Sequence, residues 1–394
     1  MNPSAKGWIA KFGHIIKDQP QPYSTFEVLY NSLRLNGFVY GFNSNLPQSV
    51  KKSFDYSPDE IAKINLINAL YYTFAISKPE NDYSDFSKDL LSFYKTLEFQ
   101  NKSIWKRLTG GMDKGGKLEM LITERVQIGE NMFARSFQKS IANALLFVDV
   151  LTFKAYIERN VEVKTYAADL ENIIINISFN AGSHISKHGN DDLGKKYSAL
   201  FKESYFFSRS KTGVNKENKK FFDELTDAEK RYLIDLTCAI CYSDYDFSEV
   251  DKTFVSNLVR EMKMDEIMGL ESMNVIEQFY AQNKKLKKQV SGSNPVFNFY
   301  DNSSVYIVKL IQRNKSRIVK EVQHSKELMS LIGKSRKRAL TIEEQKKIQV
   351  LLLDILKTIP SFAIFILPGG AILLPLFAKI LPNLLPSSFD DNKI

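Results

Sequence analysis

Cysteine is scarce in this chain, and the few cysteines present do not complete a recognised binding site. The 394 residues include only Cys238 and Cys241, which cannot build a disulfide framework. A zinc site of the Cys-x-x-Cys type needs a second pair of ligands, and no further cysteine exists to supply it. We therefore expect both cysteines to be buried in a helix, in a protein of a reducing compartment.

Proline is missing from the middle of the chain. Of the 12 prolines, none lies between Pro79 and Pro295, whereas five lie between Pro360 and Pro386. Because proline interrupts helices, a stretch of this length without it favours helical structure. The sequence predicts an all-α fold.

The patterns that accompany catalysis are also missing. The chain has no glycine-rich phosphate loop, no nucleophile elbow and no pair of catalytic carboxylates at a recognisable spacing. Its first residues do not develop the apolar run of a secretory signal. We expect a protein that is not an enzyme, has no cofactor and is not exported.

Two short patterns come near to metal sites. Asp244, Asp246 and Glu249 imitate the start of a calcium loop, but Glu249 stands where an EF-hand has glycine, and the bidentate glutamate at position twelve is missing. They are weak metal candidates, since acidic residues at a helix start are favoured by the helix dipole. His184 and His188 have the spacing of a metal pair, but the flanking glycines favour loop histidines without metal.

Residues 1–215 are predicted to form a helical domain. Ser57, Pro58 and Glu60 provide an N-cap, a first-turn proline and the glutamate of a capping box, followed by apolar residues at helical spacing. Another helix is expected from Phe86 to Leu97, and a helix or pair of helices from Leu118 to Tyr156. A polar segment, 211–220, is the predicted linker that ends this domain.

Residues 216–283 are predicted to form a separate unit of three helices. Capping boxes begin at Thr226 and Ser248, and a third helix is expected from about Asp265 to Tyr280. The order of capping box, apolar helix, acidic turn and second capped helix resembles the TerB-like helical domain. In that family some members bind a metal through the acidic turn, here Asp244, Asp246, Glu249 and Asp251.

The positive charge of the chain is concentrated in one segment. The net charge is +9, and residues 284–338 contain 14 Lys or Arg against three acidic residues. Within residues 284–340 we expect a linker and then a basic amphipathic helix over about 305–332, with Val308, Ile311, Ile318, Val322, Met329 and Ile332 on its apolar side. A polyanion, either nucleic acid or an anionic lipid surface, is the expected partner. The candidate binding residues are Arg313, Lys315, Arg317, Lys320, Lys334, Arg336, Lys337 and Arg338.

An uncharged stretch follows the basic segment. Residues 358–378 contain no charged side chain, and 21 residues is the length that a helix needs to cross a bilayer core. Prolines and glycines interrupt this region and the residues after it: Pro360, Pro368, Gly369, Gly370, Pro375, Pro382 and Pro386. A kinked spanning helix, a re-entrant hairpin and a buried hairpin of a soluble protein are all compatible with the pattern, and the membrane interpretations are favoured.

The same region carries a family resemblance. The run from Leu381 to Phe389, Leu-Pro-Asn-Leu-Leu-Pro-Ser-Ser-Phe, and the proline-punctuated segment before it resemble the membrane segment of the LETM family (leucine zipper, EF-hand-containing transmembrane proteins). The resemblance covers residues 341–389, and residues 390–394 form a short tail. In mitochondrial members this segment precedes a soluble domain credited with ribosome binding. Cation/proton exchange is also attributed to the family.

Together these features predict a membrane-associated adaptor. We expect it at the inner, cytoplasmic membrane with the bulk of the chain in the cytoplasm, bound to lipids and with the ribosome as a candidate partner. A component of a cation/proton transport system and a soluble scaffold with a buried apolar tail are the alternatives. The sequence makes no prediction of the oligomeric state or of a small-molecule substrate.

Overall fold

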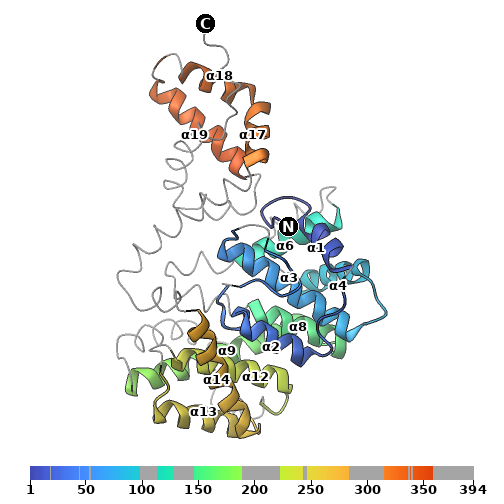
Figure 1. The fold of residues 1–394 in the computed structure, drawn as a ribbon, viewed down its shortest axis with the longest axis vertical. Helices are drawn as coiled ribbons and strands as arrows, with labels where there is room; N and C mark the ends of the chain where they lie inside the picture. Colours follow the sequence, from blue (N-terminus) through green and yellow to red (C-terminus); the bar gives the residue numbers. More distant parts are fainter. Residues whose placement is uncertain are drawn as a thin grey trace.

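The structure is a computed structural model that describes residues 1–17, 19–43, 45–52, 55–97, 113–127, 146–188, 222–242, 246–283, 315–335, 338 and 340–357. These residues form thirteen α-helices and one short 3-10 helix, and no strand occurs among them, which confirms the predicted all-α fold (Figure 1). The helices are α1 (Trp8–Lys17), α2 (Phe26–Leu35), η1 (Phe38–Tyr40), α3 (Pro58–Ser77), α4 (Tyr83–Thr96), α6 (Lys114–Gln127), α8 (Leu146–Arg159), α9 (Val163–His188), α12 (Asp227–Cys241), α13 (Glu249–Glu261), α14 (Glu266–Gln282), α17 (Lys315–His324), α18 (Lys326–Ser335) and α19 (Ile342–Lys357).

Helix α3 is the centre of the N-terminal part. It begins with the predicted capping box, in which Ser57 accepts from the backbone N–H of Glu60 and the Glu60 carboxylate accepts from the N–H of Ser57. Most of its residues are buried, because α2, α6 and α8 pack around it. The predicted helix from Phe86 to Leu97 is found as α4. The predicted segment 118–156 overlaps α6 and α8, and residues 128–145 lie outside the described residues.

Helix α12 is also buried on most of its circumference. The capping boxes predicted at Thr226 and Ser248 are both present, at the starts of α12 and α13, and α14 begins after the N-cap Asp265. Cys238 and Cys241 are free and buried within α12, as predicted. Burial and, to a smaller extent, the carboxylate of Asp235 raise the pKa of the Cys238 thiol, so this thiol stays protonated at neutral pH.

Helices on both sides of the predicted boundary at residue 215 share one hydrophobic core. The ring of Phe147 in α8 lies 5.4 Å from that of Tyr30 in α2 and 5.1 Å from that of Tyr232 in α12, measured between centroids. Helix α12 also packs along α9. The boundary itself lies outside the described residues. The domain division and the TerB-like resemblance stay predictions.

A buried ion pair fastens α2 to α12. The guanidinium of Arg34 donates to Oδ1 of Asp235 at 2.8 Å, and the side chains are 2% and 0% exposed. The hydroxyl of Tyr30 donates to the second carboxylate oxygen, and Arg34 also donates to Oγ of Ser272 in α14 at 3.3 Å. Burial and the Asp235 carboxylate raise the pKa of Tyr30, so the phenol stays protonated as a donor. The carboxylate thus joins α12 to α2, and the guanidinium of Arg34 extends the contact to α14.

The two histidines lie in a helix, which corrects the prediction of a loop. Helix α9 continues to His188, and its Ala181 is fully buried. The Nε2 atom of His184 lies 2.9 Å from Oδ1 of Asp251. The imidazole ring stacks on the ring of Phe254, with the two centroids 4.4 Å apart. Packing of α9 against neighbouring helices therefore outweighs the local preference of the flanking glycines. The side chain of His188 lies outside the described residues.

Candidate functional site

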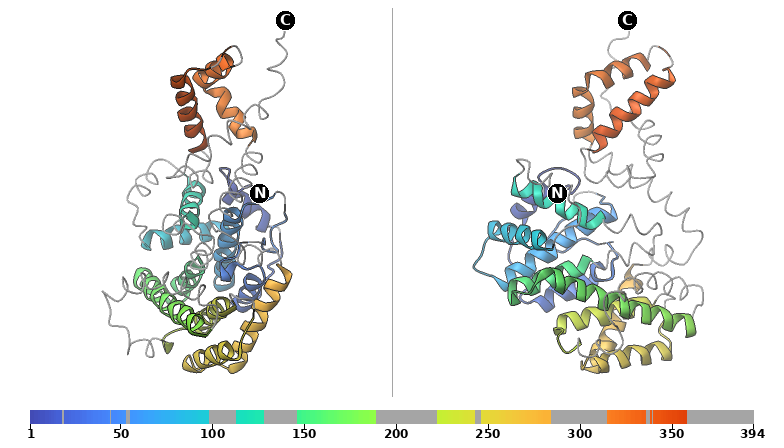
Figure 2. Two further views of the ribbon diagram at one scale, coloured as in Figure 1. Left: turned by 90° about the vertical axis from the view of Figure 1, so that its left-hand side faces the viewer. Right: turned by 180° about the vertical axis from the view of Figure 1, so that it is seen from behind.

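The last three described helices form a small group of their own. In Figures 1 and 2, α17, α18 and α19 lie together at the C-terminal end of the molecule, apart from the other labelled helices. Each helix contacts the other two, and the buried residues between them are Ile318, Val322, Leu328, Leu331, Leu352 and Ile355. We call this group the C-terminal bundle.

The predicted single helix over 305–332 is wrong in the part that is described. Helix α17 ends at His324 and α18 begins at Lys326, because Ser325 caps the new helix by accepting from the backbone N–H of Leu328 at 3.4 Å. The break changes which residues face the core: Leu328 is fully buried, while Met329 is only half-buried. The predicted apolar residues Val308 and Ile311 lie outside the described residues.

The structure describes only some of the predicted cations. Lys320 and Lys334 are exposed on α17 and α18, and Arg338 is exposed between α18 and α19. Lys315 and Arg317 lie in α17, but the structure does not describe their side chains. Arg313, Arg336 and Lys337 lie outside the described residues. The predicted membrane residues from Pro360 to Pro386 also fall outside it.

Two of the described cations share one carboxylate. Arg338 holds Glu344 in a bidentate pair, with Nη1 to Oε2 at 2.8 Å and Nη2 to Oε1 at 2.7 Å, and Nζ of Lys334 lies 3.3 Å from Oε1. Glu344 also accepts from the backbone N–H of Thr341 at 3.1 Å, and Thr341 Oγ1 accepts from the N–H of Glu344 at 3.2 Å. The Glu344 side chain is 16% exposed. We call this arrangement of Lys334, Arg338 and Glu344 the clasp.

The clasp lowers the positive charge that the bundle offers to a partner. The hydrogen bond from Arg338, then that from Thr341, lowers the pKa of Glu344 to about 2, so this carboxylate is ionised at neutral pH. Sequence reasoning missed Glu344 because the charge count stopped at Arg338. The available signal was the spacing of Thr341 and Glu344, a capping box immediately before an apolar run.

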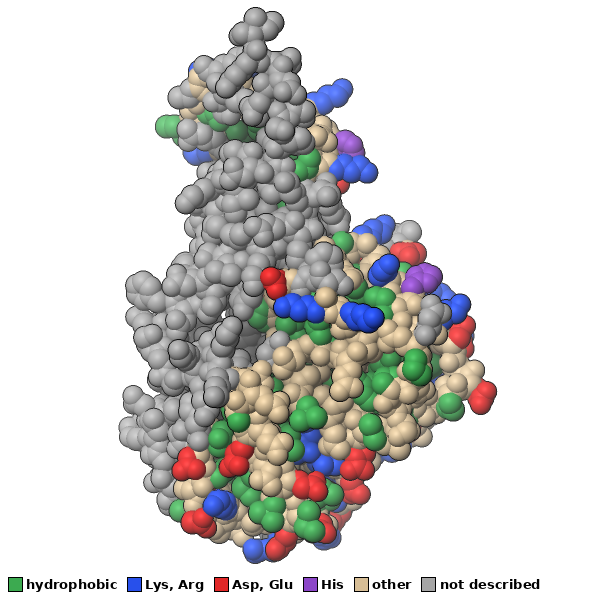
Figure 3. Space-filling view, in the orientation of Figure 1, with side chains coloured by type: hydrophobic (Ala, Val, Ile, Leu, Met, Phe, Trp, Pro, Cys, Tyr) green, Lys and Arg blue, Asp and Glu red, His purple; other side chains and the backbone are tan. Residues whose placement is uncertain are grey.

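Other cations of the bundle remain available. Lys320, Lys326 and Lys346 are exposed, and none of them has an ion pair with another described side chain, whereas Lys347 is paired with Glu327. Figure 3 shows basic side chains on the C-terminal bundle, while acidic side chains are frequent at the opposite end, where α12–α14 lie. The sequence agrees, since residues 222–283 contain 14 acidic and five basic residues. The predicted concentration of positive charge in residues 284–338 stays a prediction, because most of these residues lie outside the described ones.

One side of α19 combines charge with apolar groups. Ile342 is 72% exposed and Val350 is 57% exposed, and Lys346 lies one turn from each of them along the helix. We call these three residues the outer face of α19. On such a face the cation can bind a phosphate of a nucleic acid, and the aliphatic side chains can contact apolar parts of a protein.

The other predicted sites stay without support. Glu249 is paired with Lys252 at 2.7 Å, Asp246 is exposed, and Asp244 lies outside the described residues. No group of three or more potential metal-binding side chains occurs in the described part of the chain. In that same part, no helix is both long and apolar enough to cross a bilayer.

Comparisons with known proteins bear on the C-terminus alone. Neither curated proteins nor solved structures gave a match. A family model described as "LETM1-like, RBD", the LETM1-like ribosome-binding domain, matches residues 340–394 and confirms the predicted LETM resemblance. The sequence interpretation placed ribosome binding in a domain that follows this segment, whereas the family model gives that name to the segment itself. The segment that begins with α19 is thus similar to the LETM1-like ribosome-binding domain.

Proposed function

We propose that this chain binds the ribosome through residues 340–394, with the C-terminal bundle as part of the contact. The observation that carries the proposal is the match of these residues to the LETM1-like ribosome-binding domain. The name of the family model points to the ribosome as the partner. The lysines and arginines of the bundle are compatible with this partner, because ribosomal RNA presents a dense array of phosphates.

The geometry of the bundle supports a contact through α19. The capping box and the clasp hold the first turn of α19, and Leu352 and Ile355 pack its inner side against α17 and α18. The outer face of α19 is left exposed on a helix whose orientation is fixed. Such pre-organisation lowers the entropy cost of binding a large partner.

Co-sedimentation with ribosomes tests the proposal. We expect the full chain to pellet with ribosomes at about 100 mM salt and a chain that ends at residue 339 to stay in the supernatant, because the matched segment is gone. An unchanged melting temperature of the truncated chain would show that the remaining helices still fold. Equal pelleting of both chains, or no pelleting of the full chain, would contradict the proposal.

We further propose that the protein is a membrane-associated adaptor at the inner face of the cytoplasmic membrane. The support is the uncharged stretch 358–378, bounded by Lys357 and Lys379, since lysines at both ends suit the headgroup regions of a bilayer. Ribosome binding by the residues of 340–394 that lie outside this stretch would bring ribosomes to the membrane surface.

Fractionation of cells tests the membrane proposal separately. Deleting residues 358–389 is expected to move the protein from the membrane pellet to the soluble fraction, because burial of about 20 apolar residues exceeds the attraction of a basic surface, about 1 kcal/mol per charge. If the chain that lacks residues 358–389 stays with membranes at moderate salt, the proposal that this stretch anchors the protein is wrong.

A further inference from the structure

The outer face of α19 carries the most exposed large apolar side chain of the described part of the chain. Ile342 is 72% exposed, and Val350, on the same side of the helix, is 57% exposed. The two residues are eight positions apart, which is about 12 Å along a helix, and Lys346 lies between them. They form a short apolar stripe around a single cation.

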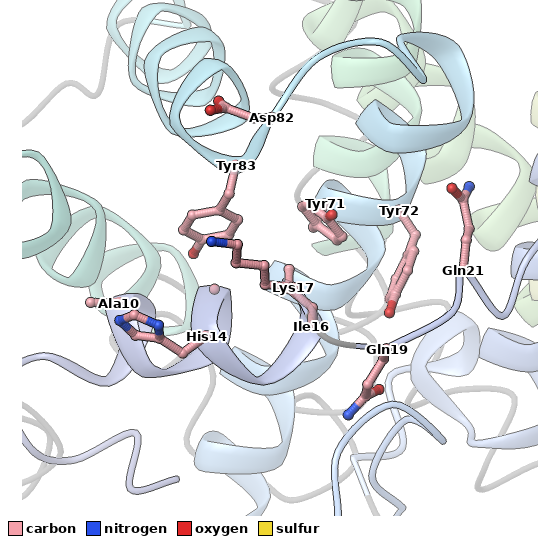
Figure 4. Close-up of a pocket in the computed structure, with 11 residues that line it drawn as sticks. Ala10, His14, Ile16, Lys17, Gln19, Gln21, Tyr71, Tyr72, Asp82 and Tyr83 are labelled. Atoms are coloured by element: carbon pink, nitrogen blue, oxygen red, sulfur yellow. The ribbon is translucent and has the colours of Figure 1, made fainter.

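The apolar side chains around a pocket in the N-terminal part are covered, in contrast to those of the outer face. This pocket has a volume of about 480 Å³ and lies between α1, α3 and α4, and Figure 4 shows Tyr71, Tyr72 and Tyr83 around it. Tyr72 is only 2% exposed, and the ring of Tyr71 packs 5.0 Å from that of Tyr72 and 5.8 Å from that of Tyr83, between centroids. These rings belong to the core, whereas the aliphatic side chains of the outer face are more than half exposed.

The exposed side of α19 carries little net charge. The helix contains three lysines and three acidic residues. Glu343 is exposed one turn before Lys346, and Asp354 is exposed two turns after it. Lys347 is paired with Glu327 of α18. A polyanion would therefore meet about as much negative as positive charge on this side of the helix.

The bundle also lacks the side chains that stack on bases. Residues 315–357 contain no phenylalanine, tyrosine or tryptophan. Proteins bind unpaired bases largely by aromatic stacking, and they bind RNA backbones through cations that neutralise phosphates. The outer face of α19 fits neither mode. Exposed aliphatic side chains along one side of a helix are typical of a surface that fits an apolar groove of another protein.

We propose that the outer face of α19 binds a protein component of the ribosome rather than its RNA. Ile342 and Val350 enter an apolar groove of that protein, and Lys346 meets a carboxylate at the rim of the groove. The inference rests on the proposed ribosome binding and names the class of partner for this one face. Lys320 and Lys326 lie on the other two helices of the bundle and can contact phosphates of RNA in the same complex.

Binding of the full chain to purified ribosomes at several salt concentrations tests the inference. We expect Ile342→Ala and Val350→Ala together to weaken binding about tenfold, because apolar contacts are lost. The slope of the logarithm of affinity against the logarithm of salt concentration should not change, because no charge is altered. Ile267→Ala with Leu270→Ala is the matched control, since both side chains are 58% exposed on α14, and it should keep its affinity. Alanine favours helices, so both variants should keep their melting temperatures.

Lys346→Gln separates protein from RNA as the partner of this face. In a protein contact it should weaken binding less than the aliphatic variant does, because a charge at the rim contributes little. In an RNA contact the order is reversed, and the salt slope becomes less negative by about one. This second pattern would overturn the inference.

A crosslink identifies the class of partner directly. With a photoreactive phenylalanine derivative at position 342, we expect a product with purified ribosomes whose added mass survives ribonuclease. Added mass that ribonuclease removes would overturn the inference. So would a full chain that pellets with ribosomes but keeps its affinity in the aliphatic variant, and that result would leave the proposed ribosome binding intact. A full chain that does not pellet would contradict the proposed function, and this inference with it.

Discussion

Replacing Asp235 by alanine is expected to lower the free energy of unfolding by about 3–5 kcal/mol, because removing one partner of a buried ion pair leaves an uncompensated charge. Asp235 is fully buried and accepts from both Arg34 and Tyr30. Its loss would leave the guanidinium of Arg34 without its ionic partner between α2, α12 and α14. The effect should reach beyond the pair itself, since Asp235 joins α12 to α2 and its partner Arg34 also bonds Ser272 of α14.

Denaturant unfolding of the Asp235→Ala variant measures this effect. Asp223→Ala is a suitable control, because Asp223 pairs with Lys263 on the surface and both side chains are more than half exposed. Its unfolding midpoint should match that of the unchanged protein. Replacing both buried partners, with Arg34→Met and Asp235→Leu together, should recover much of the loss. Equal midpoints for Asp235→Ala and Asp223→Ala would show that the buried pair does not hold the helices together.

Glu344→Gln is expected to tighten binding to ribosomes about tenfold, because it removes the carboxylate that neutralises Lys334 and Arg338. The slope of the logarithm of affinity against the logarithm of salt concentration should also become more negative by about one to two. Glutamine can still serve as the third residue of a capping box, so the start of α19 should be kept. This expectation rests on the proposed ribosome binding.

Glu343→Gln is the matched control for this variant. Glu343 lies beside Glu344 in the first turn of α19, is exposed and has no ion pair with a described side chain. Both variants remove one negative charge, but only Glu344→Gln opens the clasp. Filter-binding titrations measure the affinity of both variants for ribosomes. The same gain in affinity for both variants would mean that only net charge matters. A loss of affinity with Glu344→Gln would contradict the expectation.

The starts of helices were predictable from the sequence because capping is local. Ser57, Thr226 and Ser248 each stand three residues before an acidic side chain that bonds back to the cap, and all three capping boxes form. The all-α fold followed from the missing prolines and the helical spacing of apolar residues. These signals need no knowledge of how distant parts of the chain meet.

Contacts between distant segments could not be predicted in this way. Arg34 and Asp235 are 201 residues apart, and nothing near either residue indicates the other. The break at Ser325 was missed because apolar residues on both sides of it fit one continuous helical stripe, although a serine is also a capping residue. The helical position of His184 depends on the packing of α9 and on Asp251, which only the folded structure brings near.

The candidate site shows the same limit. Its basic character and family resemblance were readable from residues 284–394, and the family match confirms the resemblance. The sequence did not show which cations are neutralised, because the clasp forms only when the turn between α18 and α19 brings Glu344 back to Lys334 and Arg338. A charge count treats these cations as free, whereas the folded chain pairs them.

Site-specific photo-crosslinking tests the central claim, that the ribosome contacts the C-terminal bundle through α19. A photoreactive phenylalanine derivative can replace Val350 on the outer face of α19 or, as the control, Ile267 on α14, since these two side chains are 57% and 58% exposed. The account predicts that the probe at position 350 becomes covalently joined to a ribosomal component and that the probe at position 267 does not. Crosslinks from position 267 alone, or from neither position while the chain pellets with ribosomes, would contradict it.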